Sequence, residues 1–92
     1  MAASSVRLTV IFTGHVQGVG FRYQTLKCSE QFDVKGFVRN LPDGTVELVA
    51  EGERKVVDRF HQAIETRMEG YVRERMVTFS EPVADFNCFE IQ

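Results

Sequence analysis

The clearest pattern along the chain is an alternation of side-chain character over residues 6–13. One side of this segment carries the apolar residues Val6, Leu8, Val10 and Phe12, and the segment stops at Gly14. A period of two residues is typical of a β-strand that buries one face. Residues 6–13 are therefore predicted to form a strand that is at least half buried.

Two further strands are predicted at residues 34–40 and 45–51, the second of which alternates again. They are separated by the sequence Leu-Pro-Asp-Gly at residues 41–44. Proline fixes φ, aspartate hydrogen-bonds to the backbone nearby and glycine accepts a positive φ, so these residues favour a tight turn. The two strands are thus predicted to form a β-hairpin, which ends at Gly52.

Two segments instead carry apolar residues at steps of three and four, the spacing of an amphipathic α-helix. The first is residues 21–32, whose helical face consists of Phe21, Thr25, Cys28 and Phe32. The second is residues 53–69, whose stripe consists of Val56, Val57, Phe60, Ala63, Ile64 and Met68. Gly70 follows directly and is predicted to end this second helix.

The remaining segments complete a β-α-β-β-α-β order. Residues 72–81 are predicted to form a fourth strand that Pro82 ends, and residues 86–91 could add a short edge strand. Two helical stripes in so short a chain are most simply buried against one face of an antiparallel sheet. This predicts an α+β sandwich with strand order 4-1-3-2 and both helices on one face.

This topology has a consequence for function. The first two strands are joined by a helical crossover, so they run parallel and end at the same edge of the sheet. The glycine-containing segment at residues 14–20 follows the first strand, and Asn40 ends the second. The two are therefore expected to lie close together.

Composition narrows the class of protein. The chain has 92 residues, enough for one core, with 43% apolar residues and a formal net charge of -2. A mildly acidic chain has no general attraction to nucleic acid. No apolar run approaches the roughly 18 residues that a membrane span needs, so no membrane segment is expected. Residues 1–5 are expected to be a disordered leader, and residues 6–92 a single domain.

The segment after the first strand carries the most specific chemistry. Gly14, Gly18 and Gly20 lie between a predicted strand and a predicted helix, and Arg22 stands in the first helical turn. Glycines allow successive N–H groups to converge, the helix start adds unpaired N–H groups, and arginine offers a planar fork of donors. The combination favours a site for a phosphate-like anion. It matches neither the Walker pattern nor the dinucleotide pattern.

Two long segments resemble those of a known family. Residues 16–22 read Val-Gln-Gly-Val-Gly-Phe-Arg, and residues 36–47 read Gly-Phe-Val-Arg-Asn-Leu-Pro-Asp-Gly-Thr-Val-Glu. Both are similar to the signature segments of acylphosphatases, and the likeness extends over nearly the whole chain from about Val6. The resemblance implies a ferredoxin-like fold and hydrolysis of the carboxyl-phosphate bond of acyl phosphates.

The resemblance also implies which residues act. Arg22 and Asn40 match the family's catalytic arginine and asparagine. The phosphoryl oxygens would be held by the loop at Gln17, Gly18, Val19, Gly20, Phe21 and Arg22. No metal or other cofactor is implied. The expected partner is a small acyl phosphate, with no nucleic acid and no membrane, and the enzyme is expected to be a cytoplasmic monomer.

Two alternatives share this element order. An RNA-recognition sheet should carry exposed aromatic residues on its central strands, whereas residues 45–51 have none. A catalytically silent anion-binding protein is opposed, but not eliminated, by the presence of both Arg22 and Asn40. Three other candidate residues are predicted to have no catalytic role. His15 is expected in a solvated loop, His61 at the surface, and Cys28 in core packing.

Overall fold

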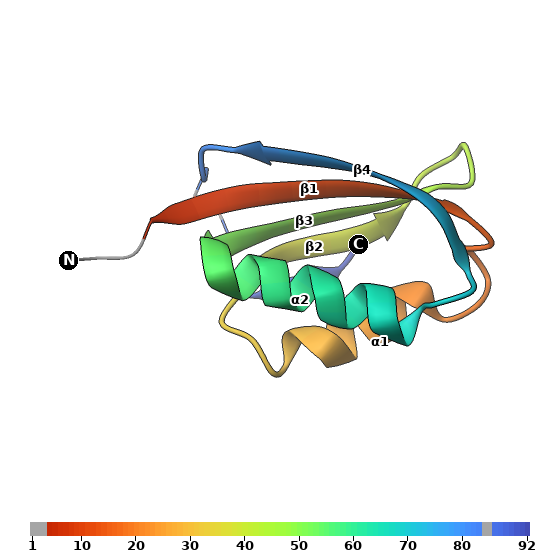
Figure 1. Ribbon diagram of the computed structural model, residues 1–92, viewed down its shortest axis with the longest axis horizontal. Helices are drawn as coiled ribbons and strands as arrows, with labels where there is room; N and C mark the ends of the chain where they lie inside the picture. The colour runs from red at the N-terminus through yellow and green to blue at the C-terminus, as the bar shows by residue number, and fades with distance from the viewer. Residues whose placement is uncertain (1–3, 84–85) are drawn as a thin grey trace.

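A computed structural model describes residues 4–83 and 86–92 as one layer of sheet with two helices packed on one of its faces (Figure 1). The elements are β1 (Ser5–Gly14), α1 (Phe21–Ser29), β2 (Lys35–Asn40), β3 (Val46–Glu53), α2 (Arg54–Arg67), β4 (Val72–Ser80) and β5 (Phe89–Ile91). The sheet order is β4-β1-β3-β2-β5. The predicted α+β ferredoxin-like fold and its order 4-1-3-2 are confirmed, with β5 added beside β2.

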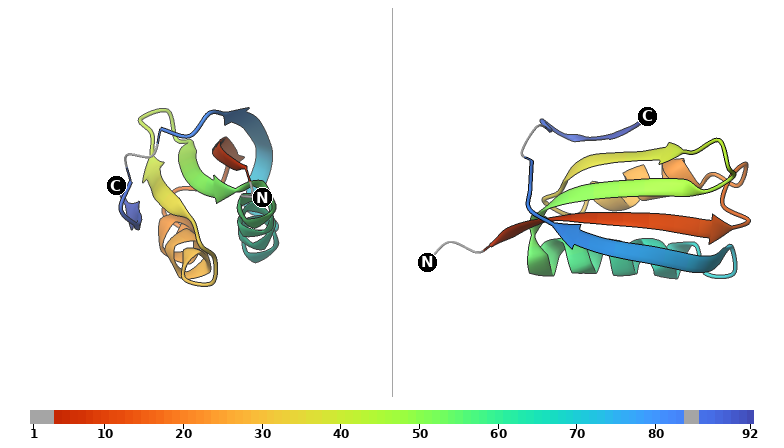
Figure 2. Two further views of the ribbon diagram at one scale, coloured as in Figure 1. Left: turned by 90° about the vertical axis from the view of Figure 1, so that its left-hand side faces the viewer. Right: turned by 90° about the horizontal axis from the view of Figure 1, so that it is seen from above.

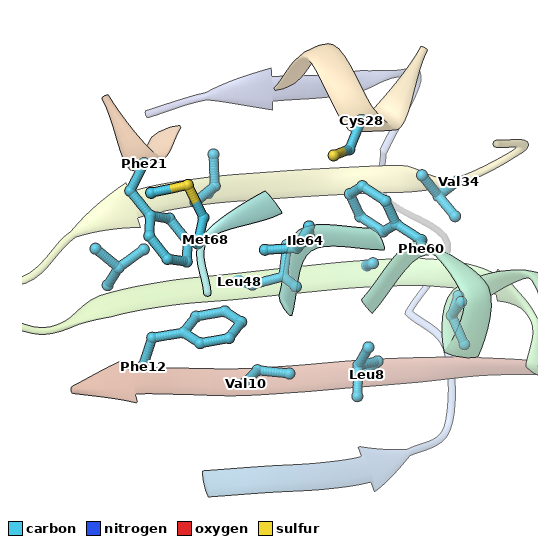
Figure 3. Packing of buried hydrophobic residues seen from close by; sticks show 14 of the residues in the cluster. Leu8, Val10, Phe12, Phe21, Cys28, Val34, Leu48, Phe60, Ile64 and Met68 are labelled. Carbon is cyan, nitrogen blue, oxygen red and sulfur yellow. The ribbon is translucent and has the colours of Figure 1, made fainter. Parts of the chain in front are cut away.

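Both helices cover the same face of the sheet (Figure 2). The buried hydrophobic core is made by side chains of both helices and of β1, β2 and β3. The predicted apolar face of β1, from Leu8 to Phe12, is fully buried. It meets the stripe of α2, where Phe60 and Ile64 are also inaccessible to solvent (Figure 3). Burying one such side chain stabilises the fold by about 1.5–3 kcal/mol. The apolar face of β1 and the apolar stripe of α2, both predicted from the sequence, therefore pack together in one core.

After β4, residues 81–83 cross the uncovered face of the sheet on the way to β5 (Figure 2). The crossing is held by Glu51, whose carboxylate accepts hydrogen bonds from the Val83 N–H at 2.7 Å and from the Arg7 guanidinium at 2.7 Å. The Phe86 ring packs edge-on against Phe37. This crossing brings β5 to lie parallel to β2, in the register Gly36↔Phe89 to Val38↔Ile91.

Several element boundaries differ from those predicted. Helix α1 ends at Ser29, and residues 30–32 continue as turns whose N–H groups bond three residues back. Gly52 does not end β3, because it is paired with Val6 and the ladder continues to Glu53. Strand β1 begins at Ser5, and the Ser4 carbonyl accepts a hydrogen bond from the Arg54 N–H. Of the expected leader, residues 1–3 lie outside the described residues.

His61 is less exposed than its place on the polar side of the second helix suggested. Its side chain is 19% exposed and its Nε2 lies 2.8 Å from the Glu65 carboxylate. The imidazole also stands edge-on to Phe12, with ring centroids 5.9 Å apart. The adjacent carboxylate also accepts hydrogen bonds from Arg75 of β4. Burial raises the pKa of Glu65, whereas the hydrogen bonds with Arg75 and His61 lower it. The hydrogen bonds dominate, so the pKa of Glu65 is lowered overall.

Gly36 allows β2 to approach β3 closely, so replacing it should destabilise the fold. Its φ is +146°, and a Cβ built there would lie 1.9 Å from the Val49 carbonyl oxygen. Gly36→Ala should therefore lower the free energy of unfolding by about 4 kcal/mol or more, the range of severe steric changes. Gly44→Ala is the matched control, since Gly44 also has a positive φ but no atom within 4 Å of its Cβ position.

The control should cost only the backbone strain of a left-handed residue, about 1–2 kcal/mol. Urea denaturation of the two variants measures both values. Equal destabilisation would show that the positive φ, and not the close approach of Val49, is what requires glycine at Gly36.

Candidate active site

The strand register brings the two predicted catalytic segments to one edge of the sheet. Val46 of β3 is paired with Phe12 of β1 on one side and with Asn40 of β2 on the other. Strands β1 and β2 therefore reach the same level of the sheet before they end (Figure 1). The loop at residues 15–20 starts from this edge, so the expected closeness of that loop to Asn40 is confirmed.

The loop is fixed to the core by Val16 near its start and by Phe21, the residue that follows its end. Val16 and Phe21 are 1% and 2% exposed, and the Phe21 ring lies 4.9 Å from the Phe12 ring between centroids. Between these anchors, Gly18 and Gly20 have φ values of +77° and +80°, with open space where a Cβ would stand. A left-handed backbone favours glycine. The loop thus combines a rigid attachment with an open backbone surface.

The backbone N–H groups of this surface have no protein acceptor. Helix α1 begins at Phe21, and its N-cap Gly20 has no side chain to cap the first turn. The first N–H to bond within the turn belongs to Gln24, which donates to the Gly20 carbonyl at 2.9 Å. Over the described residues, no N–H from Gly18 to Tyr23 donates to the protein. Such N–H groups at a helix start favour an anion.

Arg22 and Asn40 line one hollow of about 230 Å³ at this edge. The described residues of its wall are Val16, Gly18, Gly20, Phe21, Arg22, Tyr23, Asn40 and Ile91. This set contains one cation and no carboxylate. Within the described residues, Arg22 makes one long hydrogen bond, from Nη1 to the main-chain oxygen of Gln92 at 3.4 Å. Most donors of its guanidinium are therefore available to an anion in the hollow.

Only some of the predicted binding residues line the hollow. Gly18, Gly20, Phe21 and Arg22 line the hollow, with Phe21 contributing backbone because its ring is in the core. Val19 packs against the core. The side-chain amide of Gln17 donates to the Leu41 and Thr45 carbonyls at 2.8 and 2.9 Å. Neither Val19 nor Gln17 belongs to the described wall of the hollow.

Three residues of the wall, Val16, Tyr23 and Ile91, were not predicted as site residues from the sequence; Val16 directly precedes the predicted loop. Tyr23 is 56% exposed and directly follows Arg22, so its place in the first helical turn was the signal that could have found it. Ile91 lies far along the chain in β5 and reaches the site only because β5 pairs with β2. His15 is exposed, as expected, and its ring stands edge-on to Tyr71.

Asp43 holds the turn that follows Asn40, as its sequence context predicted. Its carboxylate accepts hydrogen bonds from the Thr45 hydroxyl at 2.6 Å and from the Thr45 N–H at 3.0 Å. These hydrogen bonds lower the pKa of Asp43. The turn is closed further by the Leu41 N–H, which donates to the Thr45 carbonyl at 2.9 Å. The backbone beyond Asn40 is thus well defined.

A larger hollow, of about 650 Å³, lies at the other end of β1 and β3. Its described wall includes Asp33, Glu51 and Glu53 with Lys35. Three carboxylates near one cation repel a phosphate dianion, so the smaller hollow is the better anion site. The described residues also contain no cluster of three or more His, Cys, Asp or Glu side chains placed to hold a metal ion. Neither helix of the described chain is long and apolar enough to span a membrane.

Comparison with known proteins agrees with this geometry. A family model for acylphosphatase matches residues 8–91. A curated acylphosphatase of Methanospirillum hungatei is 41% identical over 87 residues, which cover 94% of this chain and 96% of the relative. One of Paenarthrobacter aurescens is 41% identical over 92 residues, covering 99% and 98%.

A solved structure gives the same result in three dimensions. The crystal structure of acylphosphatase from Bacillus subtilis superposes with a TM-score of 0.86 at 32% identity, covering 95% of this chain and 98% of that one. The sequence match spans both segments that form the hollow, and the structural match spans the whole sandwich. The chain therefore belongs to the acylphosphatase family and is a hydrolase.

Proposed function

We propose that the enzyme hydrolyses the carboxyl-phosphate bond of acyl phosphates at the hollow lined by Arg22 and Asn40. The observation that carries the proposal is the meeting of three features there: unpaired N–H groups from Gly18 to Tyr23, one guanidinium, and one neutral amide side chain. The N–H groups and Arg22 would hold the phosphoryl oxygens. Asn40 would orient the attacking water.

This set of groups suits the chemistry of an acyl phosphate. The leaving group is a carboxylate, which departs without being protonated. Water attacks phosphorus in line, the new P–O bond forms as the bond to the acyl oxygen breaks, and the proton of the water passes to a phosphoryl oxygen of the substrate. Catalysis of this kind depends on positioning and on stabilising charge on the equatorial oxygens. Arg22 and the loop N–H groups would supply that stabilisation.

Asn40 has no useful pKa and cannot act as an ordinary general base. Its side-chain oxygen can accept a hydrogen bond from the water, while its N–H₂ group can donate to a neighbouring oxygen. Asn40 is the last residue of β2 and is paired with Val46, so its backbone is held in place. Its side chain would therefore hold the water in a defined position. The amide therefore acts by geometry and not by proton transfer.

The proposal includes a monomeric enzyme in the cytoplasm. Cys28 and Cys88 are both free thiols, which supports a reducing compartment. Burial raises the pKa of Cys28 despite the opposing influence of Arg67, so this thiol stays protonated near neutral pH and serves in packing. It is not the nucleophile of the proposed reaction.

A turnover assay with benzoyl phosphate tests the function. We expect hydrolysis at a kcat of about 1–10³ s⁻¹, the ordinary range for enzymes. Activity should survive exhaustive treatment with EDTA, and inorganic phosphate should inhibit competitively because it would occupy the same N–H groups. Phosphate binding without turnover would instead identify a catalytically silent anion-binding protein. Loss of activity with EDTA, restored by added metal, would contradict the metal-free mechanism.

A further inference from the structure

Gln17 joins the two segments that form the hollow. Its Nε2 donates both of its hydrogens, one to the Leu41 carbonyl at 2.8 Å and one to the Thr45 carbonyl at 2.9 Å. Within the described part of the chain, no other side-chain hydrogen bond connects residues 15–20 with residues 41–45. Among the side-chain hydrogen bonds of the described residues, those of one neutral amide therefore link these two segments directly.

The two acceptors lie at the ends of the turn that follows Asn40. The Leu41 N–H already bonds to the Thr45 carbonyl at 2.9 Å, and the Gly44 N–H donates to the Leu41 carbonyl at 3.1 Å. These two hydrogen bonds close the turn. Because Leu41 is the next residue after Asn40, a shift of this turn relative to the loop also shifts Asn40 relative to the N–H groups.

We infer that Gln17 is a positioning residue that sets the distance between Asn40 and the phosphoryl group held by the loop. This inference rests on the proposed function. Gln17 does not belong to the described wall of the hollow, so it acts through the backbone of residues 41–45 and not by touching the substrate. Its loss should lower kcat while leaving phosphate binding nearly intact.

The side chain required is specific. Two donors on one atom are needed to serve two carbonyl oxygens, and the amide N–H₂ of glutamine provides both without a charge. Methionine has a similar length and no donor. A glutamate carboxylate accepts hydrogen bonds only, so it would face two acceptors and also place a negative charge beside a phosphate site.

The first test is a double-mutant cycle on benzoyl phosphate hydrolysis. Gln17→Met should lower kcat about 10–100-fold, since a misplacement of about 1 Å can cost 10²-fold, while KM and phosphate inhibition change no more than about 3-fold. In the Asn40→Ala background the same substitution should change kcat less than about 2-fold, because the group that it positions is gone. Gln62→Met is the matched control, on the exposed side of α2.

The outcomes separate the possible roles. An equal fall in kcat in both backgrounds would show that Gln17 does not act through Asn40 and would overturn the inference. A rise in the phosphate inhibition constant that parallels the fall in kcat would make Gln17 a substrate-binding residue instead. The control should leave both parameters unchanged.

A second variant covers the case in which Gln17→Met does not fold. Gln17→Glu keeps the length and polarity of the side chain, and should be the slower enzyme near neutral pH. Protonation restores one donor, so its kcat relative to that of the unmodified enzyme should rise as the pH falls toward the ordinary pKa of glutamate, about 4.3. A ratio that is independent of pH would contradict the inference. If the unmodified enzyme does not hydrolyse benzoyl phosphate, the proposed function fails, and the inference with it; a failed cycle in an active enzyme rejects the inference alone.

Discussion

Replacing Arg22 by alanine is expected to lower kcat/KM for benzoyl phosphate by about three orders of magnitude or more. Arg22 is the one cation among the described residues that line the hollow. Its guanidinium would contact the phosphoryl oxygens both before and during transfer, so the substitution removes ground-state binding as well as transition-state stabilisation. Phosphate should therefore inhibit the variant much more weakly. Initial rates over a range of benzoyl phosphate concentrations measure both effects.

Arg22→Lys distinguishes charge from geometry. A lysine ammonium keeps the charge but cannot reproduce a planar fork of donors for two oxygens of one phosphoryl group. We therefore expect Lys to restore only a small part of the activity. Near-native turnover in Arg22→Lys would show that a positive charge alone is sufficient.

Arg59→Ala is the matched control for the loss of one positive charge. Arg59 is exposed on α2, outside the described wall of the hollow. The Arg59→Ala variant should retain the kcat and KM of the unmodified enzyme. The stability of Arg22→Ala should also be close to that of the unmodified protein, because the one hydrogen bond that Arg22 makes to the described residues, to the main-chain oxygen of Gln92, is long. Circular dichroism in urea checks this.

Asn40→Ala is expected to separate chemistry from binding. Arg22 and the loop N–H groups remain, so inorganic phosphate should bind within a few-fold of its original affinity. The water would lose the group that orients it, and such positioning contributes roughly two or more orders of magnitude to kcat. Measurement of kcat and of the phosphate inhibition constant in the same variant tests both parts. A parallel loss of both would assign Asn40 to substrate binding.

Asn40→Asp is the sharper variant, because it keeps the shape and an acceptor oxygen. It also places a negative charge beside a phosphoryl dianion, and like charges in a partly enclosed site repel strongly. We expect this repulsion to dominate, so Asp should be no better than Ala near neutral pH. Near-native kcat would contradict the proposed role and indicate a general base.

Asn87→Asp is the matched control for the added charge. Asn87 is exposed and outside the described wall of the hollow, and its replacement should leave kcat unchanged. A fall in kcat in this control would show that the added negative charge acts on the site from a distance, which would weaken the argument drawn from Asn40→Asp.

The sequence by itself determined the order of the elements and indicated the proposed site. The two-residue period of β1 and the helical stripe of α2 are local patterns, and a buried face has to be apolar wherever it packs. The chain order then restricted the topology to one sheet with parallel first and second strands. That topology alone places Asn40 beside the loop.

The ends of elements were predicted less well, because their hydrogen bonds are decided by neighbours. Gly52 was expected to break its strand, yet pairing with Val6 continues the ladder through it. Helix α1 stops at Ser29 although Phe32 keeps the helical spacing and still packs against the core. A side chain can therefore satisfy the apolar pattern from a turn as well as from a helix.

Only the tertiary structure decided the contacts between distant segments. Gln17 stands in a segment that the sequence assigned to binding, but its amide is used on the carbonyls of Leu41 and Thr45. Ile91 enters the hollow because β5 pairs with β2 after a crossing that Glu51 holds. Local spacing specifies which face of an element is apolar, whereas hydrogen bonds across more than twenty residues depend on how the elements pack. The types of the proposed catalytic residues were therefore readable from the chain, and their geometry was fixed by the fold.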